Sequence, residues 1–380
     1  MKVAAGSGGG GAVRHLYVHL PFCASRCGYC DFVTVVGRDR QHAAYVEALL
    51  AELALEGTAL APRLESVFLG GGTPTLTEPS ALARLLRELP RAEEVTVEAN
   101  PETVTAALAR LLRDGGVTRV SLGAQSFQPR LLDVLDRRAR PADVRRAVYT
   151  LRDAGFDNIS LDLIYGIPGQ SPADLDADLS EALALGPEHI SCYELEAKPG
   201  TRFTHAHGAE VARQADAMET YFERVVERLT GAGYRWYETA NFCRTPEAAN
   251  GDLRSRHNLA YWRGRDYLGL GIGAVSTIEN RRWRNTPRLG RYLGAMRAGE
   301  PPPREVESLP EPIRRSERVL LGLRLDEPLS LDGLAGSVDT SAVERLRRLG
   351  LVEGRSGDDA LALTERGRFL GGGVTAELLA

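Results

Sequence analysis

The sequence is short of lysine and has no long apolar run. Lys2 and Lys198 are its only lysines, so arginine supplies almost all the positive charge, and the formal net charge is −4. A chain with this balance has no general attraction to nucleic acid or to an anionic membrane surface. Because no run of about 18 apolar residues is present, we expect no transmembrane helix.

Cysteine is also scarce, with five residues in 380. Three lie close together and two, Cys192 and Cys243, stand far apart, which is not the pattern of a disulfide framework. This usage indicates a reducing compartment and a metal site. Residues 1–13 have no apolar core of a secretory signal and are predicted to be a flexible leader. We therefore expect a cytoplasmic protein.

Six short apolar runs are present, each followed by a stretch with helical spacing of apolar residues. Repeated strand–helix units predict parallel strands in an α/β fold. Six units are too few for a closed eight-stranded barrel, so residues 14–230 are predicted to form a partial, TIM-like (β/α)6 barrel. In such folds the loops after the strands build the functional site. The predicted strands are Leu16–Leu20, Ser66–Leu69, Val95–Ala99, Val120–Gly123, Ile159–Leu163 and Ile190–Leu195.

The remainder of the chain is less regular. We expect a long helix over Glu210–Leu229, a barrel extension over 231–300, and a proline-rich linker over 301–312. Residues 313–380 are predicted to form a winged-helix-like module with a helix centred on Leu334 and a two-stranded wing near its end. Ten arginines against eleven acidic residues over 312–380 argue against DNA binding by this module.

The most informative motif is C-x3-C-x2-C, formed by Cys23, Cys27 and Cys30 directly after the first apolar run. Three thiolates on one loop can bind three irons of a 4Fe–4S cluster and leave the fourth iron open. The alternative is a zinc site completed by His19 or a distant cysteine, although zinc loops usually pair two thiols with a second pair elsewhere. Tyr29 and Phe32 are expected to shield the cluster from water.

A glycine-rich segment, Leu69-Gly-Gly-Gly-Thr-Pro-Thr75, follows the second apolar run, and single polar residues follow later ones. The glycines would let the backbone approach a ligand, or would simply make a tight turn. Glu98, Gln125 and Asp162 could each be a loop or capping residue. Together they would place acceptors for ribose hydroxyls and an amino group around the barrel mouth.

These motifs, YVHLPFCASRCGYCDF, GGGTPT, VEANP, GAQSF and DLIYGIPGQ, resemble the radical S-adenosylmethionine superfamily. The resemblance runs from about Leu16 into the C-terminal module. It implies that Cys23, Cys27 and Cys30 hold a 4Fe–4S cluster whose open iron binds S-adenosylmethionine, which an electron from the cluster then cleaves to a 5′-deoxyadenosyl radical. The residues implied to contact S-adenosylmethionine are Tyr17, Tyr29, Gly71, Gly72, Thr73, Glu98, Gln125, Arg137 and Asp162.

Within that superfamily the chain is similar to the branch of oxygen-independent coproporphyrinogen III oxidases and the haem chaperones of the HemW type. The decarboxylase has a further cysteine where Phe32 stands and a longer N-terminal segment, so the chaperone type is favoured. That type carries His-Asn-x-x-Tyr-Trp, here His257, Asn258, Tyr261 and Trp262. His257 is therefore predicted to ligate haem iron; the alternative is a hydrogen-bonded structural histidine.

The resemblance implies a protein that binds haem and transfers it to acceptor proteins, with respiratory and membrane-associated ones among the candidates, and that needs an electron donor. The alternatives are a radical coproporphyrinogen III dehydrogenase, or a related porphyrin-modifying enzyme, and a structural zinc protein. Two positions depart from the chaperone pattern. Asp136-Arg-Arg-Ala139 replaces Gly-Arg-x-His, so Arg137 is assigned without the flanking glycine and histidine of the pattern, and Val275 replaces a later histidine.

Overall fold

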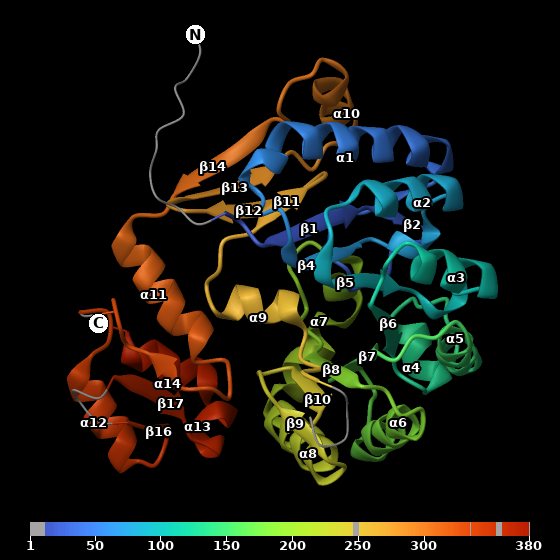
Figure 1. Cartoon of the computed structure of the whole chain (residues 1–380). Helices are drawn as coiled ribbons and strands as arrows, with labels where there is room; N and C mark the ends of the chain where they lie inside the picture. The colour runs from blue at the N-terminus through green and yellow to red at the C-terminus, as the bar shows by residue number, and fades with distance from the viewer. Residues whose placement is uncertain (1–11, 246–250, 335, 355–358, 380) are drawn as a thin grey trace.

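The computed structural model of the chain describes residues 12–245, 251–334, 336–354 and 359–379 (Figure 1). Its centre is a sheet with the strand order β11-β1-β4-β5-β6-β7-β8-β10-β9. The strands from β11 to β8 are parallel, whereas β10 and β9 run antiparallel at one edge. All six predicted strands are confirmed: β1 (His15–Leu20), β4 (Leu64–Gly71), β5 (Ala92–Ala99), β6 (Arg119–Gln125), β7 (Ile159–Tyr165) and β8 (His189–Glu194).

Helices connect these strands and cover the outer face of the sheet (Figure 1). Most begin with a signal visible in the sequence: proline stands in the first turn of α2, α4, α5 and α6, and Thr105 caps α3. Their apolar faces are buried as the periodicity predicts. The helices are α1 (His42–Glu56), α2 (Pro79–Glu88), α3 (Ala106–Asp114), α4 (Pro129–Val134), α5 (Pro141–Asp153) and α6 (Pro172–Ala184).

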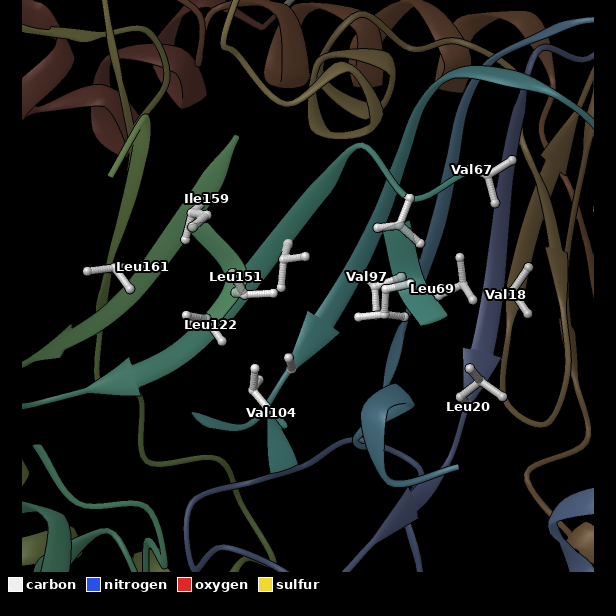
Figure 2. Packing of buried hydrophobic residues seen from close by; sticks show 14 of the residues in the cluster. Val18, Leu20, Val67, Leu69, Val97, Val104, Leu122, Leu151, Ile159 and Leu161 are labelled. Atoms are coloured by element: carbon white, nitrogen blue, oxygen red, sulfur yellow. The ribbon is translucent and has the colours of Figure 1, made fainter. Parts of the chain in front are cut away.

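Alternation along the strands separates an apolar layer from a polar one. Val18, Leu20, Val67 and Leu69 belong to the buried hydrophobic cluster between sheet and helices (Figure 2). The intervening residues, such as Tyr17, face the inside of the partial barrel. The inner face is therefore free to carry polar side chains, and the functional groups of the sequence motifs come from this face and from the loops beyond it.

After the barrel, the chain forms α7 and α8, the edge strands β9 and β10, helix α9, strand β11, and a small sheet β12-β13-β14 with α10 packed beside α1. The bounds are α7 (Arg202–Gln214), α8 (Met218–Gly231), β9 (Tyr234–Trp236), β10 (Asn241–Arg244), α9 (Arg256–Trp262), β11 (Leu268–Leu270), β12 (Val275–Ile278), β13 (Arg281–Asn285), α10 (Leu289–Arg297) and β14 (Arg304–Ser308).

The C-terminal module has its own hydrophobic cluster and a three-stranded sheet, β15-β17-β16. The predicted wing is confirmed as the antiparallel pair of β16 and β17, and β15 adds a third strand. The elements are α11 (Glu311–Gly322), β15 (Leu329–Ser330), α12 (Thr340–Arg348), β16 (Val352–Glu353), β17 (Ala360–Leu363), α13 (Glu365–Phe369) and α14 (Gly371–Leu378).

Three local expectations differ from the structure. The long helix over Glu210–Leu229 is interrupted by a 3-10 turn at Ala215–Ala217, which separates α7 from α8. Leu334 lies in a turn stabilised by its backbone bond to Leu331, not in a helix. The segment predicted as a linker, 301–312, contains β14, because Arg304–Ser308 pairs with β13.

The domain boundaries otherwise stay predictions. Residues 1–11 of the predicted leader lie outside the described part of the chain, whereas Val13 is buried and bridges to Leu60. Within the described ranges, no helix has both the length and the apolar character needed to cross a bilayer.

Candidate functional site

The three motif cysteines lie on the loop that follows β1, at the end of the barrel where the parallel strands finish. Cys23 ends the short strand β2 (Phe22–Cys23), which pairs with β3 (Val35–Val36), and all three thiols are half-buried. The other two cysteines, Cys192 and Cys243, are buried on β8 and β10. The loop thus offers three thiols, as the spacing predicts.

The loop is held by contacts with later parts of the chain. The Phe203 backbone N–H donates to the Gly28 carbonyl, so the start of α7 packs against the loop. A Cβ at Gly28 would lie 2.8 Å from the Asp136 carboxylate, so a larger residue there would require the Asp136 side chain to shift. Tyr29 packs against a separate hydrophobic cluster that contains Phe203, and its burial raises the pKa of the phenol. Phe32 is 59% exposed, so it does not shield this site from water.

The glycine-rich segment packs directly beneath the cysteine loop. Gly71 has φ +108°, and a Cβ there would lie 2.3 Å from the His19 ring. A Cβ at Gly72 would lie 2.5 Å from the Pro21 carbonyl. Thr73 donates its backbone N–H to Phe22. The close approach that the glycines permit is therefore between two parts of the chain, and it fixes where the cysteine loop starts.

A chain of polar contacts then joins two of the cysteines through the barrel. Cys23 Sγ lies 3.5 Å from Thr73 Oγ1, which accepts a hydrogen bond from Asn100 Nδ2 at 2.9 Å. Asn100 Oδ1 accepts from Arg137 Nη2 at 2.8 Å, and Arg137 Nη1 lies 3.6 Å from Cys27 Sγ. Asn100 was missed by the sequence reasoning, although it stands in VEANP one residue after the end of β5.

The position of Arg137 explains one departure from the family pattern. The preceding residue, Asp136, has φ +54°, in the left-handed region that favours glycine and that aspartate adopts more readily than most residues. Asp136 therefore substitutes for the glycine without displacing Arg137. The Arg137 guanidinium also donates to the Gly123 carbonyl at 2.7 Å and is only 8% exposed.

Two carboxylates line the inner face below the mouth. Glu98 accepts the Gly71 backbone N–H at 2.9 Å, and burial raises its pKa to about 7 despite that bond. Asp162 accepts from the Ser121 hydroxyl at 3.0 Å, and burial raises its pKa as well. Charge on two half-buried acids inside the barrel is costly, and each repels the other. This face therefore favours a ligand that brings a positive charge or hydrogen-bond donors.

Tyr17 and Gln125 complete the set predicted at the mouth. Tyr17 lies on β1, and its hydroxyl hydrogen-bonds to His19 Nδ1 at 3.0 Å. Gln125 has φ +65° at a register shift between β6 and β7, so the structure keeps a non-glycine residue in an unfavourable conformation there. Backbone strain of this kind concentrates where a side chain must be aimed.

His257 lies toward the opposite end of the barrel, with its ring centroid 6.3 Å from that of Tyr17. It is 1% exposed, and both ring nitrogens are hydrogen-bonded: Nδ1 to Ser66 Oγ at 2.9 Å and Nε2 to Tyr261 OH at 3.0 Å. Ser66 also bonds to His15 at 2.9 Å. Burial lowers the pKa of His257 to about 3. As predicted for a helix, His257 and Tyr261 share a face of α9, but that face points into the barrel floor.

A second group of hydrogen-bonded polar side chains lies at the floor of the barrel. Glu94 accepts the backbone N–H groups of Arg256 and His257 at the start of α9, and Ser255 caps the helix. A second histidine, His189, repeats the pattern, with Ser160 on one ring nitrogen and Tyr237 on the other, both at 2.8 Å. These contacts hold α9 across the N-terminal ends of the strands.

The donor set at the mouth is three half-buried thiols on one loop, and it fits the number of thiolates that a 4Fe–4S cluster with one open iron needs. Each thiolate of a 4Fe–4S cube binds its own iron, so the thiols must surround a shared space rather than meet at a point. A zinc ion would need a fourth donor that converges with the thiols on one point. Burial raises the pKa of Cys23 and Cys30, so metal binding would release protons.

Comparisons with known proteins agree with this architecture. Residues 17–182 match the family model described as the radical SAM superfamily. The chain is 38% identical to the heme chaperone HemW of Mycobacterium tuberculosis over 96% of this chain and 94% of that protein. It is 32% identical to the heme chaperone HemW of Bacillus subtilis, over 97% and 99%. A solved structure, the coproporphyrinogen III oxidase HemN from Escherichia coli, superimposes with a TM-score of 0.79 at 22% identity, over 96% of this chain and 90% of that one.

Proposed function

The chain belongs to the HemW family of radical SAM proteins, and from this membership we propose that it binds haem and transfers it to acceptor proteins. The observation that carries the proposal is the match to curated haem chaperones along nearly the whole chain. The likeness to the coproporphyrinogen III oxidase, at 22% identity, supports the fold alone. Phe32, where that enzyme branch has a further cysteine, favours the chaperone.

We also propose that Cys23, Cys27 and Cys30 hold a 4Fe–4S cluster beside an S-adenosylmethionine site. Such a cluster, with three thiolates, offers an open iron position to the amino and carboxylate groups of S-adenosylmethionine. Side chains of the chain itself would position the cluster and the S-adenosylmethionine. Arg137 places positive charge 3.6 Å from Cys27 Sγ, and Glu98 offers a carboxylate to an amino group. Both are held in place by backbone groups of barrel strands, Gly123 of β6 for Arg137 and Gly71 of β4 for Glu98.

Haem ligation by His257 stays a prediction, and it would require existing hydrogen bonds of the histidine to break. Both ring nitrogens are engaged in the barrel floor, so iron would have to displace Ser66 or Tyr261 and α9 would have to move. The structural alternative, a hydrogen-bonded histidine, is satisfied by the contacts present. We therefore derive no step of haem transfer through His257.

The proposed compartment is the cytoplasm, because all five cysteines are free thiols and three of them sit half-buried on one loop. An electron donor and the acceptor proteins are the proposed macromolecular partners. The acceptors would be haem proteins, including those of respiratory chains.

Titration of the purified, anaerobically reconstituted protein with hemin tests the function. We expect a saturable Soret band at one haem per chain, followed by its loss when an apo-haem protein is added and gains the haem. A Soret response no larger than that of hemin in the same buffer without protein would reject the proposal. Release of carbon dioxide from coproporphyrinogen III, with consumption of S-adenosylmethionine, would instead support the dehydrogenase.

A further inference from the structure

A groove lies on the outer surface of the barrel, between α2 and α3. It has a volume of about 1220 Å³. Figure 1 shows the two helices side by side at the edge of the molecule. The groove also reaches the segments that enter β4 and β5, so it lies toward the end of the barrel where the strands begin. It is therefore separate from the cysteine loop, which lies where the strands end.

Each helix presents one regular stripe of residues to the groove. The lining positions include Ala83, Leu86, Arg87 and Pro90 on and just after α2, and Ala107, Arg110, Leu111 and Asp114 on α3. Both sets follow the spacing i, i+3, i+4, i+7 of a single helical face. The stripes meet at one end, where a Cβ at Gly115 would lie 2.7 Å from Leu86 Cδ1. The packing of the two helices therefore sets the shape of the groove.

The floor of the groove is apolar. Leu89, Val95 and Leu111 line it and are half-buried, so part of each side chain is open to solvent. Covering these side chains with apolar groups of a ligand would remove apolar surface from water, which favours binding. The described residues that line the groove include no aromatic side chain on which a base or another flat ring could stack.

The rim of the groove is positively charged. Its arginines are Arg63, Arg87, Arg91 and Arg110, all of them exposed. In the part of the chain that the structure describes, none of these four side chains makes a hydrogen bond or an ion pair, whereas Arg84 on the same helix α2 pairs with Glu47 at 2.9 Å. The one acidic residue among the lining positions is Asp114. The groove is thus locally basic in a chain whose formal charge is −4.

The fold brings these arginines to the groove from separate segments. Leu64 and Ala92 are paired where β4 and β5 begin, and the Leu64 backbone N–H donates to the Arg91 carbonyl at 2.9 Å. Arg63 and Arg91 directly precede this pair, so they lie on neighbouring segments at the start of the sheet. The other two arginines come from the two helical walls, Arg87 from α2 and Arg110 from α3. Positive charge therefore lies around the apolar floor and not along a single helix.

We propose that this groove binds an acidic amphipathic helix of a partner protein. Apolar side chains on one face of that helix would cover Leu89, Val95 and Leu111, and carboxylates beside them would pair with the rim arginines. Arginine suits this role because its planar guanidinium can donate two parallel hydrogen bonds to one carboxylate. This binding is independent of the proposed haem binding.

The apolar floor distinguishes this occupant from other anionic partners. A nucleic acid would contact the arginines through its phosphates but would leave the leucines and Val95 uncovered. An anionic membrane surface is bound by apolar side chains that protrude into it, whereas Leu89, Val95 and Leu111 are half-buried between two helices. An amphipathic helix with acidic flanks matches both the floor and the rim.

Fluorescence anisotropy of a dye-labelled peptide tests the proposal on the full chain. The peptide has about 16 residues, with leucines on one helical face and glutamates beside them. We expect Arg87→Ala/Arg110→Ala to bind it about tenfold more weakly than the unmodified chain, because two charged contacts are lost. The matched control is Arg291→Ala/Arg297→Ala, which removes the same charge from exposed positions on α10 and should bind the peptide like the unmodified chain.

A second pair of variants tests the groove without changing its charge. Ala107→Trp places a bulky ring among the lining residues, whereas Ala106→Trp places the same ring at an exposed position of α3 outside the lining. We expect Ala107→Trp to weaken peptide binding at least about tenfold by steric exclusion, and Ala106→Trp to leave it unchanged. Thermal unfolding followed by circular dichroism establishes that both variants are folded.

Equal peptide affinity of Arg87→Ala/Arg110→Ala and its control, or no peptide binding by the unmodified chain, would overturn the groove as a site for an acidic helix. Binding of phosphatidylglycerol vesicles that requires Arg87 and Arg110, without peptide binding, would overturn it in favour of a lipid surface. The hemin titration measures haem binding separately, so failure of this proposal and failure of the proposed function are distinguishable.

Discussion

The two ends of the barrel are built on different principles. At the mouth, residues occupy strained or crowded conformations, as with Gln125 at φ +65° and Gly71 against the His19 ring, and three thiols remain half-buried. At the floor, His257 and His189 each have both ring nitrogens hydrogen-bonded and are fully enclosed. The mouth keeps three half-buried thiols and backbone strain, whereas the two floor histidines have both ring nitrogens hydrogen-bonded. The comparison therefore separates motif residues into binding and folding roles.

The sharpest test of this contrast removes one thiol at the mouth. We expect Cys27→Ala to lose the 4Fe–4S cluster after anaerobic reconstitution, because three thiolates are the minimum that holds it. Iron and sulfide analysis with the visible absorption spectrum measures this loss. Cys192→Ala, which removes a thiol buried in the core, is the control and should retain iron. Full iron content in Cys27→Ala would contradict the assignment of the mouth.

The reverse result is expected at the floor. His257→Ala should lower the free energy of unfolding by about 3–5 kcal/mol, because it leaves a cavity and removes the partners of Ser66 and Tyr261. Iron content should be unchanged. Urea unfolding measures this loss. The control is Asn258→Ala, at a half-buried position of α9, which should lower the free energy of unfolding by less than about 1 kcal/mol. A stable variant that has lost haem binding would instead favour ligation by His257.

Gly71→Ala should affect the mouth with a smaller cost to the fold. The added Cβ would meet the His19 ring at 2.3 Å and the backbone has φ +108°, so we expect a loss of about 2–3 kcal/mol together with reduced cluster content. Gly116→Ala has a comparable positive φ of +83° but no atom within 4 Å of its Cβ. It should cost about 1 kcal/mol and leave iron content unchanged. Equal iron content in both variants would show that crowding at Gly71 has no role in the site.

An effect confined to a window of pH is expected at Glu98. Because burial raises the pKa of Glu98 to about 7 from its ordinary 4.5, the folded chain holds this proton more tightly than the unfolded one. Glu98 therefore costs stability as pH rises from about 4.5 to 7. Glu98→Gln should gain up to about 3 kcal/mol relative to the unmodified chain across that window. Denaturation at several pH values measures the difference, and a difference that does not vary with pH would mean that Glu98 titrates normally.

The pH dependence of stability is expected to have the opposite sign for His257 at the floor. The pKa of His257 falls to about 3 through burial, so its contribution is lost as pH falls below about 6.5, where the unfolded chain takes up a proton that the folded chain does not. The deficit of His257→Ala should therefore shrink as pH falls. The two ends of the barrel would then respond to pH in opposite directions.

The sequence by itself determined the local features of this protein. Apolar runs and helical spacing predicted all six barrel strands and the faces of α2 and α5, because burial of alternating or periodic side chains is a short-range pattern. The spacing of Cys23, Cys27 and Cys30 placed three thiols on one loop for the same reason. The short-range pattern gave a wrong prediction where pairing with another segment determines the structure. Arg304–Ser308 was predicted to be part of a linker, but it forms β14 because it pairs with β13.

Only the tertiary structure decided how distant residues combine. Asn100 links Thr73 to Arg137, and no spacing along the chain reveals a contact between three separate loops. The same holds for HNLAYW, in which the sequence showed a helix face but not what faces it. The fold sets His257 against Ser66 in the barrel floor and Trp262 against the Arg324 guanidinium. Side-chain chemistry is fixed by sequence, but its surroundings, and hence its role, arise only when the strands and α9 pack together.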